Sequence, residues 1–247
     1  MAKFVKHDKC PRCGSRDNLG RYSDDSAFCF GCHYTERPGI SPWVGERNGS
    51  SEEDDDGQRV VFPDDATTSL DSRAIDWLGK YNIGVAEALR AGFRWSPYWE
   101  QLLMPLNDSD GNICCIQAKN FNLKRASKAK YYNVGDKSNS VTIYGRGTRL
   151  VLTEDIVSSL RVGHTTASMP LLGTHLARNR LAALRQVYQH LVVWLDEDKW
   201  KEARAIADAA KLLGFTAKTL LTHIDPKEFS DMDIKQLINQ IHTRSTQ

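Results

Sequence analysis

The chain has 247 residues, enough for about one to two domains of ordinary size. Apolar residues make up 40% and charged residues 26%, with 33 Lys and Arg against 31 Asp and Glu, so the bulk composition is that of a globular protein and indicates no particular partner. The N-terminus lacks the apolar core of a signal peptide, and the longest apolar run, Leu191–Leu195, is too short to span a membrane. We therefore expect a cytoplasmic protein with no membrane partner and with reduced cysteines.

Four of the six cysteines follow a metal-binding pattern, with two Cys-x2-Cys pairs separated by fifteen residues. They are Cys10, Cys13, Cys29 and Cys32. Each pair turns two thiolates toward one point, and four thiolates complete the tetrahedral coordination of a zinc ion. His33 is an alternative ligand, although four cysteines already fill the coordination sphere. The spacing predicts one structural zinc ion in a zinc ribbon that spans residues 1–40.

Residues 41–69 have the composition of a linker. The segment contains Pro, Gly and Ser and carries eight acidic residues against two basic ones. We expect it to be a flexible acidic connection between the zinc ribbon and the rest of the chain.

The next region, residues 70–148, combines helical and strand patterns. Spaced apolar residues predict short helices that end near Gly92; they are Ile75, Leu78, Ile83, Ala86 and Leu89. Apolar strands at 102–106 and 112–116 flank a segment of turn residues and predict a hairpin. Within residues 111–150, eight basic residues stand against one acidic residue, and tyrosines interrupt the run, which indicates contact with nucleic acid or nucleotides.

From residue 149 onward, short apolar runs alternate with helical patterns. The runs lie at 150–152, 169–172, 191–195 and 219–221. This alternation predicts a parallel sheet with helices on its faces, and in such sheets ligands bind at the carboxyl ends of the strands. The predicted fold class is α/β here and α+β over the whole chain.

Carboxylates follow three of these runs. Glu154 and Asp155 follow the first, Asp196 and Asp198 follow the third, and Asp225 follows the last. In an extended segment, Asp196 and Asp198 lie on one side and can face Glu154 across the sheet edge. Clustered carboxylates repel one another and suit Mg²⁺ or Mn²⁺, which bind oxygen ligands and bridge to phosphates. Each acid taken alone would be a solvated surface residue, but their shared placement at strand ends favours a metal site.

Taken together, these residues resemble the DNA primases of bacteria and phages, in which a zinc ribbon precedes a catalytic TOPRIM fold that type IA and II topoisomerases share. The likeness covers nearly the whole chain and is closest to the primase half of phage primase-helicases. Further segments carry it: 74–78 with 92–93, 103–106 with 110–113, and 130–133 with 143–145. It implies an RNA polymerase domain with a mixed basic subdomain at 70–148 and a TOPRIM parallel-sheet subdomain at 149–247 that ends in a helix.

The resemblance implies a DNA-directed RNA polymerase that makes short RNA primers on single-stranded DNA from nucleoside triphosphates during DNA replication. Its catalytic residues and Mg²⁺ ligands would be Glu154, Asp196 and Asp198, which hold one or two Mg²⁺ or Mn²⁺ ions, with Asp155 and Asp225 as further candidate ligands. The nucleotide- or DNA-binding residues would be Lys119, Lys124, Arg125, Lys128 and Lys130. The chain has no Gly-x4-Gly-Lys-Ser/Thr loop, so we expect a separately encoded helicase and DNA polymerase as partners. For a phage-encoded chain the location would be the host cytoplasm.

The sequence also departs from this family. The family commonly has Gly directly after the glutamate and Asp four residues after it, whereas this chain has Asp155 and Ser158 at these positions. The sequence therefore leaves open whether a second metal ion binds or whether Asp155 supplies its ligand instead. Two alternatives differ in function: a zinc-plus-TOPRIM recombination mediator that binds DNA without turnover, and a TOPRIM nuclease. The mediator usually has a helix-hairpin-helix segment before its cysteines, and here nine residues precede Cys10. A topoisomerase would need a much longer chain.

Overall fold

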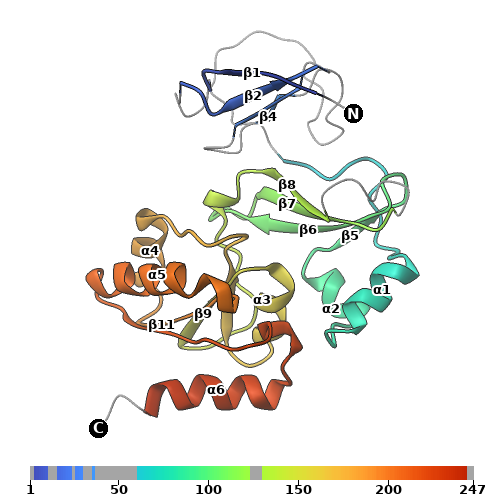
Figure 1. Cartoon of the computed structure of the whole chain (residues 1–247). Coiled ribbons are helices and arrows are strands. Elements are labelled where there is room, and N and C mark those ends of the chain that lie inside the picture. Colours follow the sequence, from blue (N-terminus) through green and yellow to red (C-terminus); the bar gives the residue numbers. More distant parts are fainter. Residues whose placement is uncertain are drawn as a thin grey trace. The chain divides into compact units, whose positions relative to one another are not determined.

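A computed structural model describes residues 3–10, 16–23, 26–29, 35–36, 60–122 and 130–243. The chain divides into two compact units, Met1–Glu53 and Asp54–Gln247. Across the described ranges, two antiparallel sheets and one parallel sheet combine with helices, which confirms the mixed α/β class (Figure 1). No helix in these ranges is long and apolar enough to cross a membrane.

The first unit contains a small antiparallel sheet. Its strands pair in chain order: β1 (Phe4–Asp8), β2 (Leu19–Tyr22), β3 (Ala27–Cys29) and β4 (Thr35–Glu36). Among the residues of this unit that the structure describes, a buried cluster contains Cys10, Leu19, Ala27 and Cys29. A unit of this length usually needs a metal ion or disulfides to be stable.

The second unit begins with two short helices and an antiparallel sheet. The elements are α1 (Ser72–Gly79), α2 (Val85–Arg90), β5 (Arg94–Ser96), β6 (Gln101–Asn107), β7 (Ile113–Asn120) and β8 (Tyr131–Gly135), and the sheet order is β5-β6-β7-β8. The Asp71 side chain caps α1 by accepting a hydrogen bond from the backbone of Arg73 at 2.9 Å. Gly92 follows α2 with φ of 84°, a conformation that favours glycine, and turns the chain toward β5. The helices ending near Gly92 and the β6–β7 hairpin are both confirmed.

The parallel sheet forms the rest of the second unit. Its strands are β9 (Arg149–Thr153), β10 (Ala167–Pro170), β11 (His190–Trp194) and β12 (Thr216–Thr219), in the order β10-β9-β11-β12 with every neighbouring pair parallel. The connecting helices are α3 (Ile156–Val162), α4 (Arg178–Arg185) and α5 (Trp200–Leu212), and α6 (Asp231–Thr243) follows the last strand. Short 3-10 helices lie at Lys137–Asn139, Glu197–Lys199 and Pro226–Glu228. The predicted alternation of strands and helices is confirmed.

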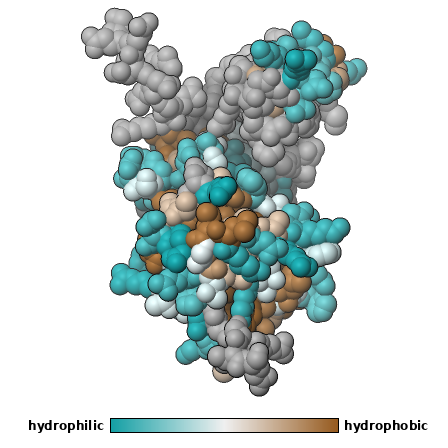
Figure 2. All heavy atoms as spheres, turned by 90° about the vertical axis from the view of Figure 1, so that its left-hand side faces the viewer, coloured by the Kyte–Doolittle hydropathy of each residue, from teal (hydrophilic) through white to brown (hydrophobic). Residues whose placement is uncertain are grey.

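Helices cover both faces of the parallel sheet. On one face, α4 and α5 pack against alternate strand residues such as Leu152 and Val193. On the opposite face, α3 and α6 cover Val151, Val192 and Trp194. Viewed from the side of α4 and α5, the surface is largely hydrophilic around a hydrophobic area (Figure 2). Because both faces are covered, the open edge at the strand ends is the part of the sheet that remains for a ligand.

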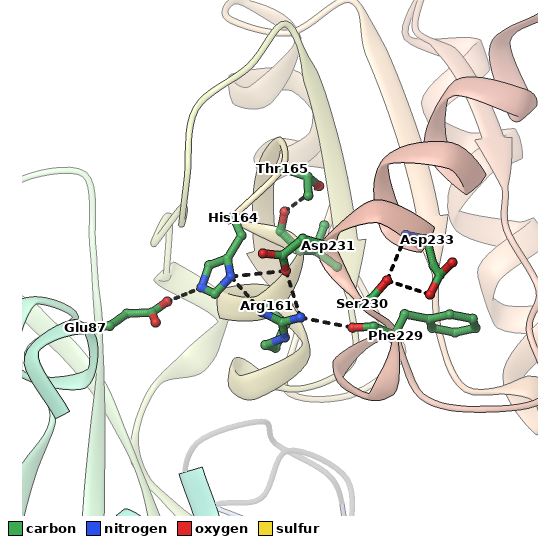
Figure 3. Close-up of polar contacts among 9 residues, drawn as sticks. Glu87, Arg161, His164, Thr165, Phe229, Ser230, Asp231 and Asp233 are labelled. Carbon is green, nitrogen blue, oxygen red and sulfur yellow. Dashed lines mark hydrogen bonds and ion pairs between the residues drawn. The ribbon is translucent and has the colours of Figure 1, made fainter. Parts of the chain in front are cut away.

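Helix α3 joins the two halves of the second unit. Its residues Ile156, Val157 and Leu160 belong to the same core as α1, α2 and the antiparallel sheet. At its C-terminal end, His164 contacts Glu87 of α2 at 2.5 Å and Asp231 of α6 at 3.3 Å (Figure 3). The buried Arg161 pairs with the same Asp231 at 2.7 Å (Figure 3). These contacts tie the C-terminal end of α3 to α2 and α6, and the N-terminal end of α3 directly follows Glu154 and Asp155.

Two sequence predictions differ from the structure in detail. The last strand is Thr216–Thr219, whereas the apolar run at 219–221 predicted it three residues later. This strand is an edge strand that pairs with β11 alone, so it can carry polar residues, and Leu220 is buried just after it. In α1, Ile75 is 38% exposed because Ala74 and Leu78 form the buried face. The described end of the predicted linker, residues 60–69, is attached to β5, where Thr67 pairs with Trp95.

Candidate active site

The strand order creates a switch point between β9 and β11. From β9 the chain continues to β10 on one side and then returns to β11 on the opposite side. In open α/β sheets, ligands bind in the crevice beyond the carboxyl ends of the strands at such a point. Thr153 pairs directly with Trp194, so Glu154 and the segment to Asp196 leave the sheet beside each other. Two of the three predicted catalytic acids, Glu154 and Asp196, therefore border the switch point.

Glu154 carries an unsatisfied buried oxygen. The side chain is half-buried, and its Oε2 atom makes no hydrogen bond to any residue in the described part of the chain. Burial raises the pKa of Glu154, and the charge of Asp196 raises it further, against a smaller opposing effect of Lys199. A buried carboxylate oxygen without a donor is costly, so this position favours a bound cation or a donor from a ligand.

Asp196 shares this environment. Burial raises the pKa of Asp196, and the carboxylate of Asp225 adds to the shift, while the charge of Lys227 opposes it. Weaker contributions come from Asp155 and Asp198, which also raise the pKa of Glu154. The structure thus brings together the five carboxylates that the sequence selected.

The segment after β11 is not extended. Asp198 lies in the 3-10 helix Glu197–Lys199, so the expectation that strand alternation places Asp196 and Asp198 on one side was wrong. The helix forms because the parallel strand has already ended at Trp194 and the chain turns toward α5. Asp198 is 70% exposed and pairs with Lys199. It acts on the buried acids through its charge.

Asp155 and Asp225 share one ammonium group. Asp155 caps α3, because its Oδ1 accepts a hydrogen bond from the backbone of Ser158 at 2.9 Å and its Oδ2 accepts one from the Ser158 hydroxyl at 2.7 Å. Lys227 Nζ donates to Asp155 Oδ2 at 3.0 Å and to Asp225 Oδ2 at 2.5 Å. Burial by itself would lower the pKa of Lys227, but the two carboxylates outweigh it and raise that pKa. Lys227 is therefore a charged bridge within the carboxylate cluster.

Lys119 lies in an aromatic cage formed by three side chains. Its Nζ atom is 4.7 Å from the ring centroid of Trp77, 4.8 Å from that of Phe121 and 5.0 Å from that of Tyr131. The residue is 6% exposed, and burial lowers the pKa of Lys119 to about 8, with the charges of Lys130 and Lys80 adding to the shift. The rings stabilise the ammonium by cation–π attraction but shield it from water.

The aromatic cage borders the carboxylate cluster. Burial raises the pKa of Tyr131, and among nearby charges Asp155 raises it and Lys227 lowers it. Lys227 Nζ also lies 5.8 Å from the ring centroid of Tyr81, whose ring packs against Trp77 at 5.6 Å. The cationic and acidic parts of the candidate site therefore form one continuous region.

The remaining predicted basic residues are only partly described. Lys130 is exposed, with its Nζ atom 5.5 Å from the Tyr131 ring centroid. Lys124, Arg125 and Lys128 lie outside the described residues. The roles of all five basic residues stay predictions.

Two of the four predicted zinc ligands lie among the described residues. Cys10 and Cys29 lie in the same buried cluster. Cys13, Cys32 and the alternative ligand His33 lie outside the described residues. The shared position of the first two is what a common metal ion requires, and the complete ligand set stays a prediction.

The carboxylates match a divalent ion whose remaining ligands are waters or substrate phosphates. Among the described residues, no three Cys, His, Asp or Glu side chains are grouped closely enough to hold a metal ion by themselves. Asp155 and Asp225 face Lys227, and Asp198 faces Lys199. Mg²⁺ is usually bound through one or two carboxylates together with waters and substrate phosphates. The unpartnered oxygen of Glu154 and the adjacent Asp196 fit such an ion.

Sequence reasoning missed the lysines among the acids. Lys227 stands two residues after Asp225, and Lys199 directly follows Asp198. Both were visible next to predicted ligands, but nothing in the spacing indicated which acids they would contact. Lys227 reaches Asp155, which is 72 residues away in the chain.

Comparison with known proteins gives matches at the level of structure. No protein-family model and no curated protein matches the chain. The Aquifex aeolicus primase, in its zinc binding and RNA polymerase domains, is 13% identical, with 97% of this chain and 80% of that chain covered and a TM-score of 0.57. A DnaG primase catalytic domain bound to ssDNA is 14% identical, with 70% and 71% covered and a TM-score of 0.52. The chain has a primase fold.

A phage protein also matches. The primase fragment of the bacteriophage T7 primase-helicase protein is 17% identical, with 96% of this chain and 99% of that chain covered and a TM-score of 0.47. The matches to the Aquifex aeolicus primase and to the DnaG catalytic domain confirm, for the fold, the primase resemblance inferred from the sequence.

Proposed function

We propose that the protein is a DNA primase, a DNA-directed RNA polymerase that makes short RNA primers on single-stranded DNA during DNA replication. The observation that carries the proposal is the adjacent pair Glu154 and Asp196 at the switch point of a sheet with a primase fold. A neighbour with this fold has ssDNA bound, which supports the same kind of template here.

In the proposed reaction, the 3′-hydroxyl of one ribonucleotide attacks the α-phosphate of the next, and pyrophosphate leaves. Glu154, Asp196 and Asp198 would hold Mg²⁺ or Mn²⁺. The bound ion would neutralise charge on the phosphates during the transfer. The carboxylates are held at the ends of rigid strands, so they position the reacting groups rather than form covalent bonds.

The basic residues would offset the charge of the triphosphate and the template. Lys119 and Lys130 lie in the region that borders the carboxylates through Tyr131. Lys124, Arg125 and Lys128 are proposed for the same role because they belong to the same basic run.

The domain organisation follows the sequence. We propose a zinc ribbon at 1–40, in which Cys10, Cys13, Cys29 and Cys32 bind one structural zinc ion, and an acidic linker at 41–69. The basic subdomain would span 70–148 and the TOPRIM subdomain 149–247. The buried cluster that contains both Cys10 and Cys29 supports a shared metal site at these two cysteines.

The decisive experiment is primer synthesis on random-sequence single-stranded DNA with four labelled ribonucleotides and Mg²⁺. We expect labelled oligomers from the wild type, their loss in Asp196→Ala, and their retention in Asp208→Ala, which removes an exposed acid of α5. Failure to form oligomers while DNA binding persists would favour the recombination mediator. Cleavage of the template would favour the nuclease.

We also propose that a separately encoded replicative helicase and a DNA polymerase act with this protein in the host cytoplasm. Stimulation of primer synthesis by a hexameric helicase would support that partnership. Unchanged synthesis together with failure to co-purify would count against it.

A further inference from the structure

Lys227 connects two acids that come from different strand ends. Asp155 follows β9, and Asp225 precedes the 3-10 helix that comes after β12. The ammonium lies 3.0 Å from Asp155 Oδ2 and 2.5 Å from Asp225 Oδ2, and the Lys227 side chain is 16% exposed. A group that bridges two carboxylates in this way takes the position that a bridging metal ion would need.

The surroundings hold the lysine in place. Both carboxylate oxygens of Asp155 already accept hydrogen bonds from Ser158 as the cap of α3. Pro226, between Asp225 and Lys227, is buried and restricts the backbone there. The 3-10 helix that contains Lys227 also packs against α3. The bridge is therefore part of the folded scaffold, and not a mobile surface pair.

Glu154 and Asp196 lack such a bridge. Glu154 Oε2 is buried and has no hydrogen-bond partner among the described residues. Asp196 makes no side-chain cap hydrogen bond at the start of its 3-10 helix. The five acids thus divide into a pair that shares a built-in cation and a group in which Glu154 and Asp196 form no ion pair with any described residue.

We propose that Lys227 is a fixed cation of the candidate active site, which neutralises Asp155 and Asp225 so that the cluster binds one divalent ion, at Glu154 and Asp196. Lys227 is then a positioning residue that sets the number of metal ions. The inference rests on the proposed function for the purpose of that ion, but the number of bound ions can be measured without any synthesis.

The test counts Mn²⁺ ions on the full-length, zinc-loaded protein without nucleotide or DNA, by electron paramagnetic resonance of free Mn²⁺. Thiolates prefer Zn²⁺ to Mn²⁺, so the zinc site does not enter the count. We expect one ion per chain in the wild type and in Lys227→Arg, which keeps the positive charge. We expect two in Lys227→Met, because Asp155 and Asp225 lose their cation.

Lys211→Met is the matched control, because Lys211 pairs with Asp208 at 2.8 Å on the exposed side of α5. Its count should stay at one. Lys227→Gln, which keeps a hydrogen-bond donor without the charge, should also bind two and serves if Lys227→Met does not fold. A wild type that binds two ions or none would overturn the inference, and so would a folded, uncharged variant that still binds one.

The two proposals can fail separately. Absence of primer synthesis together with a count that rises from one to two would remove the proposed function and leave the role of Lys227 intact. Primer synthesis by a wild type that binds two ions would do the reverse.

Discussion

Asp155 and Asp225 share the ammonium of Lys227, whereas Glu154, at the same edge of the sheet, keeps a buried oxygen without a partner among the described residues. Glu154 and Asp155 both follow β9, whereas Asp196 follows β11 and Asp225 follows β12 of the same parallel sheet. On the paired side, the two carboxylates outweigh the effect of burial and raise the pKa of Lys227. On the unpaired side, burial and neighbouring carboxylates raise the pKa of both Glu154 and Asp196.

The difference indicates that Asp155 and Asp225 serve mainly the structure, whereas Glu154 and Asp196 are available to a ligand. Asp155, which pairs with Lys227, also caps α3 and so contributes to the stability of the fold. Acids that repel one another without a cation lower stability, and such exceptions to favourable local chemistry are expected at functional sites. The unpaired side is therefore where a ligand has most to contribute.

The largest expected effect is a difference in primer synthesis between a variant of the unpaired side and a variant of the paired side. Glu154→Gln should reduce primer synthesis by about 100-fold or more, since it removes an acid that would hold the ion opposite the phosphates. Asp225→Asn should reduce it less, because Lys227 retains Asp155. Initial rates of oligomer formation at saturating Mg²⁺ would measure both. Equal losses would contradict the division of the cluster.

The aromatic cage gives the next effect. If Lys119 binds triphosphate, the affinity should fall about 10-fold between about pH 7 and pH 9, because burial lowers the pKa of Lys119 to about 8 and the lysine loses its charge in that range. Lys119→Arg should bind with little pH dependence, since a guanidinium stays protonated. Calorimetric titration with a nucleoside triphosphate would give the profile. A wild-type affinity that does not change with pH would mean that Lys119 has a structural role in the aromatic cage and does not bind the triphosphate.

Much of the candidate site was predictable because it depends on local pattern. The alternation of apolar runs and helices predicted the parallel sheet, and the rule for strand ends gathered five acids from three separate segments. These arguments need only the direction of the strands and their order along the chain.

The pairing of charges was not predictable, because it depends on three-dimensional neighbours. No spacing rule predicts that Lys227 contacts Asp155. None predicts that Lys119 lies among rings from α1, from the residue after β7 and from the start of β8. The 3-10 helix at Asp198 was missed because the extended conformation was assumed to continue past the buried run Leu191–Leu195 to Asp198. Edge strand β12 was misplaced because its polar residues conceal it.

A smaller effect concerns stability on the paired side. Asp225→Asn should destabilise the metal-free protein by about 1 kcal/mol, because a largely buried ammonium loses one of its two carboxylates. For a unit of this size, the melting temperature should fall by about 2–4 °C. Asp208→Asn removes the carboxylate of an exposed ion pair and should change stability by less than about 0.5 kcal/mol. A similar result for both variants would mean that the Lys227 bridge contributes no more than a surface pair.

The smallest effect should have the opposite sign on the unpaired side. Burial, followed by the charge of Asp196, raises the pKa of Glu154, so the folded protein holds this proton more tightly than the unfolded chain. The metal-free wild type should therefore lose stability as pH rises through the raised pKa of Glu154. Glu154→Gln removes the titrating charge and should melt at a slightly higher temperature than the wild type near neutral pH.

That advantage should shrink as pH falls, because protonation of Glu154 relieves the repulsion in the wild type as well. Melting in magnesium-free buffer across this pH range, with the exposed turn variant Asp110→Asn as control, would measure it. Added Mg²⁺ should stabilise the wild type more than Glu154→Gln, since an ion bound only to the folded state stabilises it. A Glu154→Gln variant that melts below the wild type near neutral pH without Mg²⁺ would show that Glu154 has a favourable partner in the folded protein, and the contrast between the two sides would be lost.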